Sequence, residues 1–167
     1  MTSGLTSSVV LSLFLLVTSV VFLFLVESWT DQSLNTALAM NRNLARVESA
    51  IAFTSTAQDQ PAACDTYTAQ VENTGEVTVA DFSEADVLVE YTNAGSSKVA
   101  TRLAYTSDWS VTGIAPDTRD PNSWNPEETA TISFTLSPSA KDGTSGVIIL
   151  VTSLGISDSA YFTCSIS

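Results

Sequence analysis

The sequence predicts an α+β protein in which a long, hydrophobic N-terminal α-helix precedes an immunoglobulin-like antiparallel β-sandwich. Two observations carry this prediction. Residues 9–26 contain no charged side chain, and residues 66–165 divide into short apolar-polar alternating segments separated by turns rich in Asn, Gly and Pro. We therefore expect an N-terminal helical domain over residues 1–56 and a β-sandwich domain over residues 57–167.

The apolar run at residues 9–26 is long enough to form a membrane helix. Its eighteen residues, at about 1.5 Å per residue, extend over about 27 Å, close to the ~30 Å hydrocarbon core of a bilayer. Large apolar side chains occupy every turn, so the helix must be covered on all sides by lipid or by copies of itself. No Lys or Arg precedes the run and no clear small-residue cleavage site follows it, which disfavours a cleaved secretory signal.

Residues 34–53 are predicted to continue as an amphipathic helix. Their apolar residues recur at spacings of three and four, and no Gly or Pro interrupts the segment. We expect one helix from about residue 5 to about residue 53; the alternative is a membrane helix followed by a separate stalk helix, with Trp29 as an interfacial anchor. The residues expected to pack on neighbouring helices are Val9, Leu13, Leu16, Val20, Leu23, Met40, Leu44, Val47 and Ile51.

The segment after the helix is predicted to form the sandwich. Pro61 lies in a short polar linker that cannot continue the helix. The predicted strands are residues 66–72, 77–82, 86–92, 98–105, 109–111, 129–136, 146–151 and 160–165. Short strands spaced by turns over about 105 residues are typical of an immunoglobulin-like sandwich. Alternation within these strands places in the core Val87, Val89, Tyr91, Ile132, Phe134, Leu136, Ile148 and Leu150.

The chain has two cysteines, Cys64 and Cys164, near the two ends of the predicted sandwich. If the first and last strands are neighbours, a disulfide between them closes a loop of about a hundred residues and stabilises the fold by roughly 4–5 kcal/mol. Such a bond requires an oxidising compartment. The alternative is two buried free thiols. A zinc site is disfavoured because the chain has no histidine to complete the ligand set.

The charged residues exclude several classes of function. Eighteen acidic and six basic residues give a net charge of −12, without the basic cluster that binding to nucleic acid requires. The absence of histidine excludes Ser-His-Asp and Cys-His catalysis. No phosphate-binding loop, dinucleotide-binding turn or C-x-x-C pair is present. We therefore expect no enzymatic activity, no cofactor and no nucleic-acid partner.

One loop concentrates oxygen ligands. Asp117, Asp120, Glu127 and Glu128 lie within twelve residues, and calcium binds six to eight such oxygens. Their spacing does not match an EF-hand. A long inter-strand loop with a solvated acidic surface is the first interpretation, and a calcium site is the second.

The whole chain resembles the archaellum proteins, namely the archaellins and the related membrane-anchored stator proteins. The resemblance rests on the apolar N-terminal segment and on three motifs: ENTGEVTV at residues 72–79, WNPEETATISFTL at 124–136 and GVIILVTSLGISDSAYF at 146–162. Glu127 departs from the family's Asn-Pro-Gly-Glu pattern, in which glycine occupies its position. Leu5 stands where bacterial type IV pilins carry Glu, which favours the archaellum branch.

The resemblance implies a structural subunit that polymerises through its N-terminal helix into an archaellum-like or pilus-like extracellular filament. The partners it implies are identical subunits, the membrane before assembly, a prepilin-type leader peptidase and a dedicated assembly machinery. The nine residues named above would then form the polymerisation core. The alternative is a membrane-anchored extracytoplasmic stator protein, and a more distant one is a membrane-tethered ligand-binding module.

Overall fold

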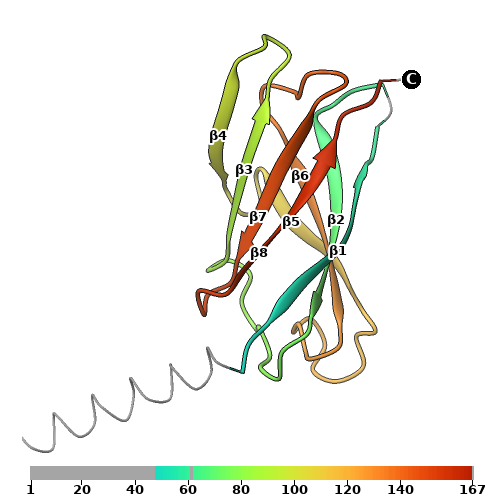
Figure 1. The fold of residues 1–167 in the computed structure, drawn as a ribbon. Coiled ribbons are helices and arrows are strands. Elements are labelled where there is room, and N and C mark those ends of the chain that lie inside the picture. The colour runs from blue at the N-terminus through green and yellow to red at the C-terminus, as the bar shows by residue number, and fades with distance from the viewer. Residues whose placement is uncertain (1–47, 61, 167) are drawn as a thin grey trace, which may run out of the picture. The chain divides into compact units, whose positions relative to one another are not determined.

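A computed structural model describes residues 48–60 and 62–166. These residues form two four-stranded antiparallel sheets that face each other (Figure 1). One sheet has the order β1-β2-β6-β5 and the other has the order β4-β3-β7-β8. The strands are β1 (Ile51–Gln58), β2 (Thr66–Asn73), β3 (Asp86–Thr92), β4 (Lys98–Leu103), β5 (Trp109–Ala115), β6 (Thr129–Thr135), β7 (Ser145–Val151) and β8 (Ser157–Thr163).

The predicted N-terminal helix falls almost entirely outside the described residues. Residues 1–47, with the apolar run and eight of the nine expected polymerisation residues, are among those that the structure does not describe. In the part of the chain that it does describe, no helix has the length and apolar character needed to cross a bilayer.

Strand β1 corrects the predicted end of the helix. Residues 51–53 are extended rather than helical, and Ile51 pairs with Asn73 on β2. Ile51 therefore packs beside the sandwich core and is not part of a polymerising helix. Its segment, IAFTSTAQ, is rich in β-branched and hydroxyl side chains, which favour a strand once a partner strand is available. The sandwich accordingly includes residue 51, ahead of the expected boundary at residue 57.

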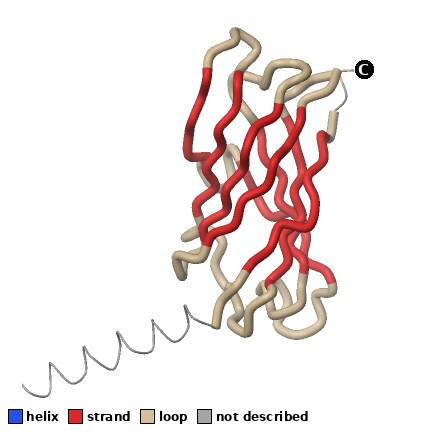
Figure 2. Tube along the Cα trace, viewed as in Figure 1, coloured by secondary structure: helices blue, strands red, loops and turns tan. Residues whose placement is uncertain are grey.

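The other strand predictions differ from the structure mainly at one site. Residues 77–82 form no strand; Val79 makes only an isolated antiparallel bridge to Trp124. The predicted strand at 86–92 has the same bounds as β3, whereas β5 runs four residues further than expected, to Ala115. All seven of the remaining predicted strands are present (Figure 2).

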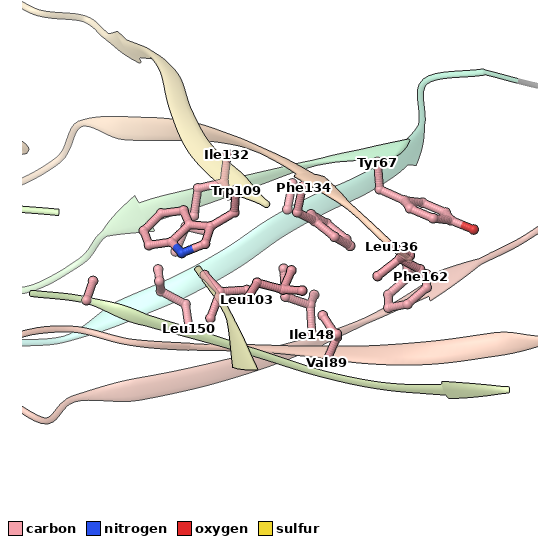
Figure 3. Close-up of a cluster of buried hydrophobic side chains, with 14 of the residues drawn as sticks. Tyr67, Val89, Leu103, Trp109, Ile132, Phe134, Leu136, Ile148, Leu150 and Phe162 are labelled. Carbon is pink, nitrogen blue, oxygen red and sulfur yellow. The ribbon is translucent and has the colours of Figure 1, made fainter. Parts of the chain in front are cut away.

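The core lies between the two sheets. Figure 3 shows Tyr67, Trp109, Ile132 and Phe134 of one sheet facing Val89, Leu103, Ile148, Leu150 and Phe162 of the other. The eight core residues predicted from alternation are all buried, so that prediction is confirmed. The Tyr67 ring centroid lies 5.4 Å from that of Phe134 and 4.7 Å from that of Phe162, so aromatic contacts join the sheets.

One edge of the sandwich is closed by contacts between β1 and β8. The Phe53 amide donates to Asp158 Oδ2 at 2.8 Å, and the Thr56 hydroxyl donates to the Tyr161 carbonyl at 2.7 Å. A disulfide joins Cys64, just before β2, to Cys164, just after β8, with the Cα atoms 5.4 Å apart. The first and last strands are therefore neighbours, and neither cysteine of the chain is a free thiol.

Candidate functional site at the junction with the N-terminal segment

Residues 48–50 lead from the N-terminal segment into β1, and the turn that follows β2 holds their backbone. The Gly75 amide donates to the Ala50 carbonyl at 2.9 Å, and the Glu76 amide donates to the Glu48 carbonyl at 2.8 Å. These two hydrogen bonds continue the β1–β2 pairing beyond the register pair Ile51 and Asn73. The backbone of residues 48–50 is therefore held against the turn that follows β2.

The close approach at this junction explains the glycine of the Asn-Thr-Gly turn. A Cβ atom on Gly75 would lie 2.4 Å from the Ala50 nitrogen and 2.7 Å from the Glu48 oxygen. Both are backbone atoms, which cannot rotate away as the end of a flexible side chain can. Only glycine fits unless the entering segment moves.

Asn73 links this turn to a second loop. Its side chain is buried; Nδ2 donates to the Val77 carbonyl at 2.9 Å and to the Trp124 carbonyl at 3.0 Å. Its Oδ1 accepts from the Gly75 amide at 3.2 Å. The amide group therefore uses both its donor and its acceptor functions, as a buried polar group must to avoid a desolvation cost.

The second loop, residues 124–128, is organised around Glu128. Glu128 Oε2 accepts from the Asn125 backbone amide at 2.9 Å and from Asn125 Nδ2 at 3.1 Å, while its carbonyl oxygen accepts from Trp124 Nε1 at 2.7 Å. The same carbonyl accepts from the Asn73 amide at 2.9 Å, and the Glu127 amide donates back to the Asn73 carbonyl at 2.8 Å. A continuous set of hydrogen bonds thus runs from the second loop through Asn73 to the entering segment.

The electrostatics of Glu128 suit this structural role. Burial alone would raise the pKa of its carboxyl, but hydrogen bonds from the backbone and side chain of Asn125 and from the Thr118 amide outweigh burial and lower the pKa, with a smaller contribution from Arg119. Glu128 is therefore ionised at neutral pH, and its charge is matched by donors within the loop.

Glu127 occupies a left-handed backbone conformation, with φ of 66°. Residues other than glycine adopt this region at a cost because Cβ approaches a neighbouring carbonyl. This geometry gives a physical reason for the glycine at the corresponding position of the Asn-Pro-Gly-Glu pattern.

The calcium interpretation stays a prediction, and the structure does not gather Asp117, Asp120, Glu127 and Glu128 into one cluster. Among the described residues, no group of three or more Asp, Glu, His or Cys side chains is placed to hold a metal ion. The Glu128 carboxylate is directed at loop amides, and Asp117 Oδ2 accepts from the Asn122 amide at 3.3 Å. The first interpretation, a long inter-strand loop, describes this segment.

The sequence motifs pointed to this region, but sequence reasoning missed their contact. The Asn-Thr-Gly and Trp-Asn-Pro-Glu-Glu motifs are about fifty residues apart, and the structure brings them together at one end of the sandwich. The only available signal was the concentration of Asn, Gly and Pro in both motifs, which predicts turns but does not predict which turns meet.

No family model matches the chain, and a search of curated proteins finds no relative. Solved structures do match. The archaellum periplasmic stator protein FlaG from Sulfolobus acidocaldarius is 20% identical with a TM-score of 0.53, and the alignment covers 68% of this chain and 99% of FlaG. This domain has the archaellum-protein fold.

Two further matches extend this finding. The archaeal flagellum of Methanospirillum hungatei strain JF1 is 15% identical with a TM-score of 0.67, and the alignment covers 99% of this chain and 95% of that one. The archaeal flagellin FlaB1 from Methanocaldococcus jannaschii is 11% identical with a TM-score of 0.52, covering 71% and 91% of the two chains. The resemblance to archaellum proteins drawn from the sequence is thus confirmed at the level of the fold.

Proposed function

We propose that this chain is the structural subunit of an archaellum-like or pilus-like surface filament. In this proposal the N-terminal segment forms the polymer core, and the acidic sandwich faces the medium. The observation that carries the proposal is the junction, where the amides of Gly75 and Glu76 hold the backbone of residues 48–50. A filament subunit would carry force through the first residues of its outer domain, and these hydrogen bonds hold those residues in place.

The apolar run supports the same proposal. Exposing the large side chains of residues 9–26 to water would cost on the order of tens of kcal/mol, at about 1.5–3 kcal/mol each. Lipid would cover them before assembly, and neighbouring copies would replace lipid in the polymer. A prepilin-type peptidase and an assembly machinery would act at the membrane. We assign the chain no enzymatic activity, since its sequence has no histidine and its fold is that of a flagellin, a flagellum subunit and a stator protein.

A membrane-anchored stator is the second candidate. It is favoured by the likeness to FlaG, which extends over 99% of that chain. The richness of residues 9–26 in Leu and Phe also suits a permanent anchor, because close helix packing in membranes usually relies on small residues. The alignment with the flagellum, over 99% of the present chain, favours the filament.

Immunogold electron microscopy distinguishes the two candidates. Antibodies against the folded sandwich are applied to intact cells that carry surface filaments, with deletion cells as the labelling control. A subunit places gold along the full length of each filament. Gold confined to the cell-proximal base or to the cell envelope would contradict the proposal and support the stator.

A further inference from the structure

The outer faces of the two sheets differ in chemistry. On the β1-β2-β6-β5 sheet, the outward positions of the central strands β2 and β6 carry mostly hydroxyl groups, namely those of Thr66, Thr68, Thr129, Thr131, Ser133 and Thr135. On the β4-β3-β7-β8 sheet, the outward positions include Leu88, Val147, Ile149, Val151 and Tyr161. We call these five residues the apolar face.

The apolar face is continuous across three strands. Leu88 on β3 pairs with Ile149 on β7, and Val147 on β7 pairs with Tyr161 on β8. Leu88 is 38% exposed and Tyr161 is 76% exposed. Strand β7 is thus apolar on both sides, although a sheet with one solvated face needs apolar residues on its inner side only.

A shallow hollow interrupts this face beside Tyr161. Its volume is about 180 Å³, and it is lined by Glu90, Thr92, Lys98, Ser145, Val147 and Tyr161. Gly146 lies beneath it, and a Cβ atom there would meet the Phe162 ring at 2.3 Å. The face therefore combines an exposed aromatic side chain with a depression in which a neighbouring surface can seat a side chain.

The charged residues at the outward positions of the same sheet are two acids and two bases, so their charges balance. Lys98 lies 3.9 Å from Glu90, and Arg102 pairs with Asp86. The chain as a whole carries −12, so copies that approach through predominantly acidic surfaces repel each other. Approach through the apolar face avoids that repulsion, which points to a second copy of this chain as the occupant.

We propose that the apolar face docks on a neighbouring copy of this chain in the filament. This inference rests on the proposed function and adds the surface through which the outer domains meet. The three strands that carry the apolar face, about 4.8 Å apart and about 23 Å long, present roughly 330 Å², less than half the ~800 Å² per partner of a stable interface. The contact accordingly supplements the packing of the N-terminal segments.

Site-specific photo-crosslinking tests this surface in the full chain. p-Benzoylphenylalanine replaces Tyr161 on the apolar face or Gln70, an exposed outward residue of the opposite sheet, as the matched control. Filaments are irradiated and the crosslinked peptides are identified by mass spectrometry. We expect the probe at position 161 to give covalent dimers with a second copy at severalfold higher yield than the probe at position 70.

Three outcomes overturn the inference: equal yields at the two positions, capture of another protein at position 161, or crosslinks only within one copy. Filaments that contain the chain but give any of these results leave the proposed function intact. If instead the proposed function is wrong, the filaments lack this chain altogether, which is a different result from the three above.

A second variant tests the same surface without a probe. Leu88→Thr with Ile149→Thr removes apolar area from the face, whereas Thr68→Val with Thr131→Val changes the hydroxyl-rich sheet. After controlled shear, we expect the first pair of substitutions to reduce the median filament length at least twofold. The second pair should leave that length unchanged. Unfolding temperatures verify that each domain is folded, and equal filament lengths in both variants contradict the inference.

Discussion

The amide of Gly75 donates to the carbonyl of Ala50 at 2.9 Å, and the approach of the two chains leaves no room for a side chain on Gly75. This contact joins the segment that enters the sandwich to a turn whose asparagine also contacts the loop at residues 124–128. Two of the three motifs that carry the family resemblance therefore contact each other at one place in the sandwich. Substitutions at this contact therefore test whether it stabilises the domain.

Gly75→Ala should destabilise the junction. The new Cβ would lie well inside van der Waals distance of backbone atoms of Glu48 and Ala50. We therefore expect the free energy of unfolding to fall by about 1–3 kcal/mol, as it does for other overpacking substitutions. Gly113→Ala is the control, because a Cβ there meets nothing within 4 Å. Urea unfolding of the full chain in detergent measures both changes. Equal effects of the two substitutions would show that the close approach at Gly75 has no energetic role.

Glu127→Gly should stabilise the sandwich. Relief of the left-handed strain at φ of 66° is worth about 1–2 kcal/mol, and the added chain entropy of glycine offsets about 0.5–1 kcal/mol of that gain. The unfolding temperature should therefore rise by a few degrees. Glu84→Gly, at an exposed turn residue without positive φ, provides the comparison and should not stabilise. A lower unfolding temperature for Glu127→Gly would refute the strain argument.

Tyr67 and Tyr91 are both buried but differ in their hydrogen bonding. The Tyr67 hydroxyl has no hydrogen-bond partner, whereas the Tyr91 hydroxyl donates to the Pro138 carbonyl at 2.6 Å. Tyr67→Phe should raise the free energy of unfolding by about 1 kcal/mol, and Tyr91→Phe should lower it by about the same amount. Denaturant titration at pH 7 gives both values. Destabilisation by both substitutions would indicate that the Tyr67 hydroxyl has a partner.

Alkaline pH should weaken the fold through the same two residues. Burial, with the charge of Asp65 as a smaller cause, raises the pKa of Tyr67 to about 12, and burial also raises the pKa of Tyr91. Because the folded state holds the hydroxyl proton more tightly than the unfolded state does, the protonated tyrosine contributes fully to stability below pH 10, its ordinary pKa. This contribution is lost as the pH rises toward 12. Tyr67→Phe should reduce the slope of stability against pH in this range. An unchanged slope would argue against ionisation of Tyr67 as a cause of alkaline unfolding.

Acid should weaken the fold through Glu128. Its pKa is lowered in the folded protein, so its contribution is present above pH 4.5, the ordinary value, and is lost as pH falls below it. Glu128→Gln should lower the unfolding temperature at neutral pH and flatten the acid limb of the stability profile. Glu90→Gln, on the exposed sheet face, should do neither. If the stability of Glu128→Gln falls with acid as that of the native chain does, the hydrogen bonds to this carboxylate do not stabilise the loop.

Much of the sandwich could be predicted because its signals are local. Alternation of Val87, Val89 and Tyr91 identified β3 with its observed bounds, and the same pattern identified the core. Strand β1 was missed because the helical spacing of apolar residues continues to Ile51, and pairing with β2 decides the conformation of the residues that follow.

The junction could not be predicted for a related reason. The local pattern around Val79 predicts a strand, but its bridge to Trp124 spans 45 residues of sequence. The hydrogen bond from Asn73 to the Trp124 carbonyl spans 51 residues. Turn residues identify where a chain reverses direction, whereas the meeting of two turns depends on the packing of every strand between them.

Quantitative mass spectrometry of sheared surface filaments tests the proposed polymer most directly. Filaments are separated from the membrane fraction of the same cells, and this chain is quantified in both. If the chain is the subunit, it should be the dominant protein of the filament fraction and should greatly exceed its amount in the membranes. A filament fraction that lacks this chain, with the protein retained in the membranes, would contradict the proposal.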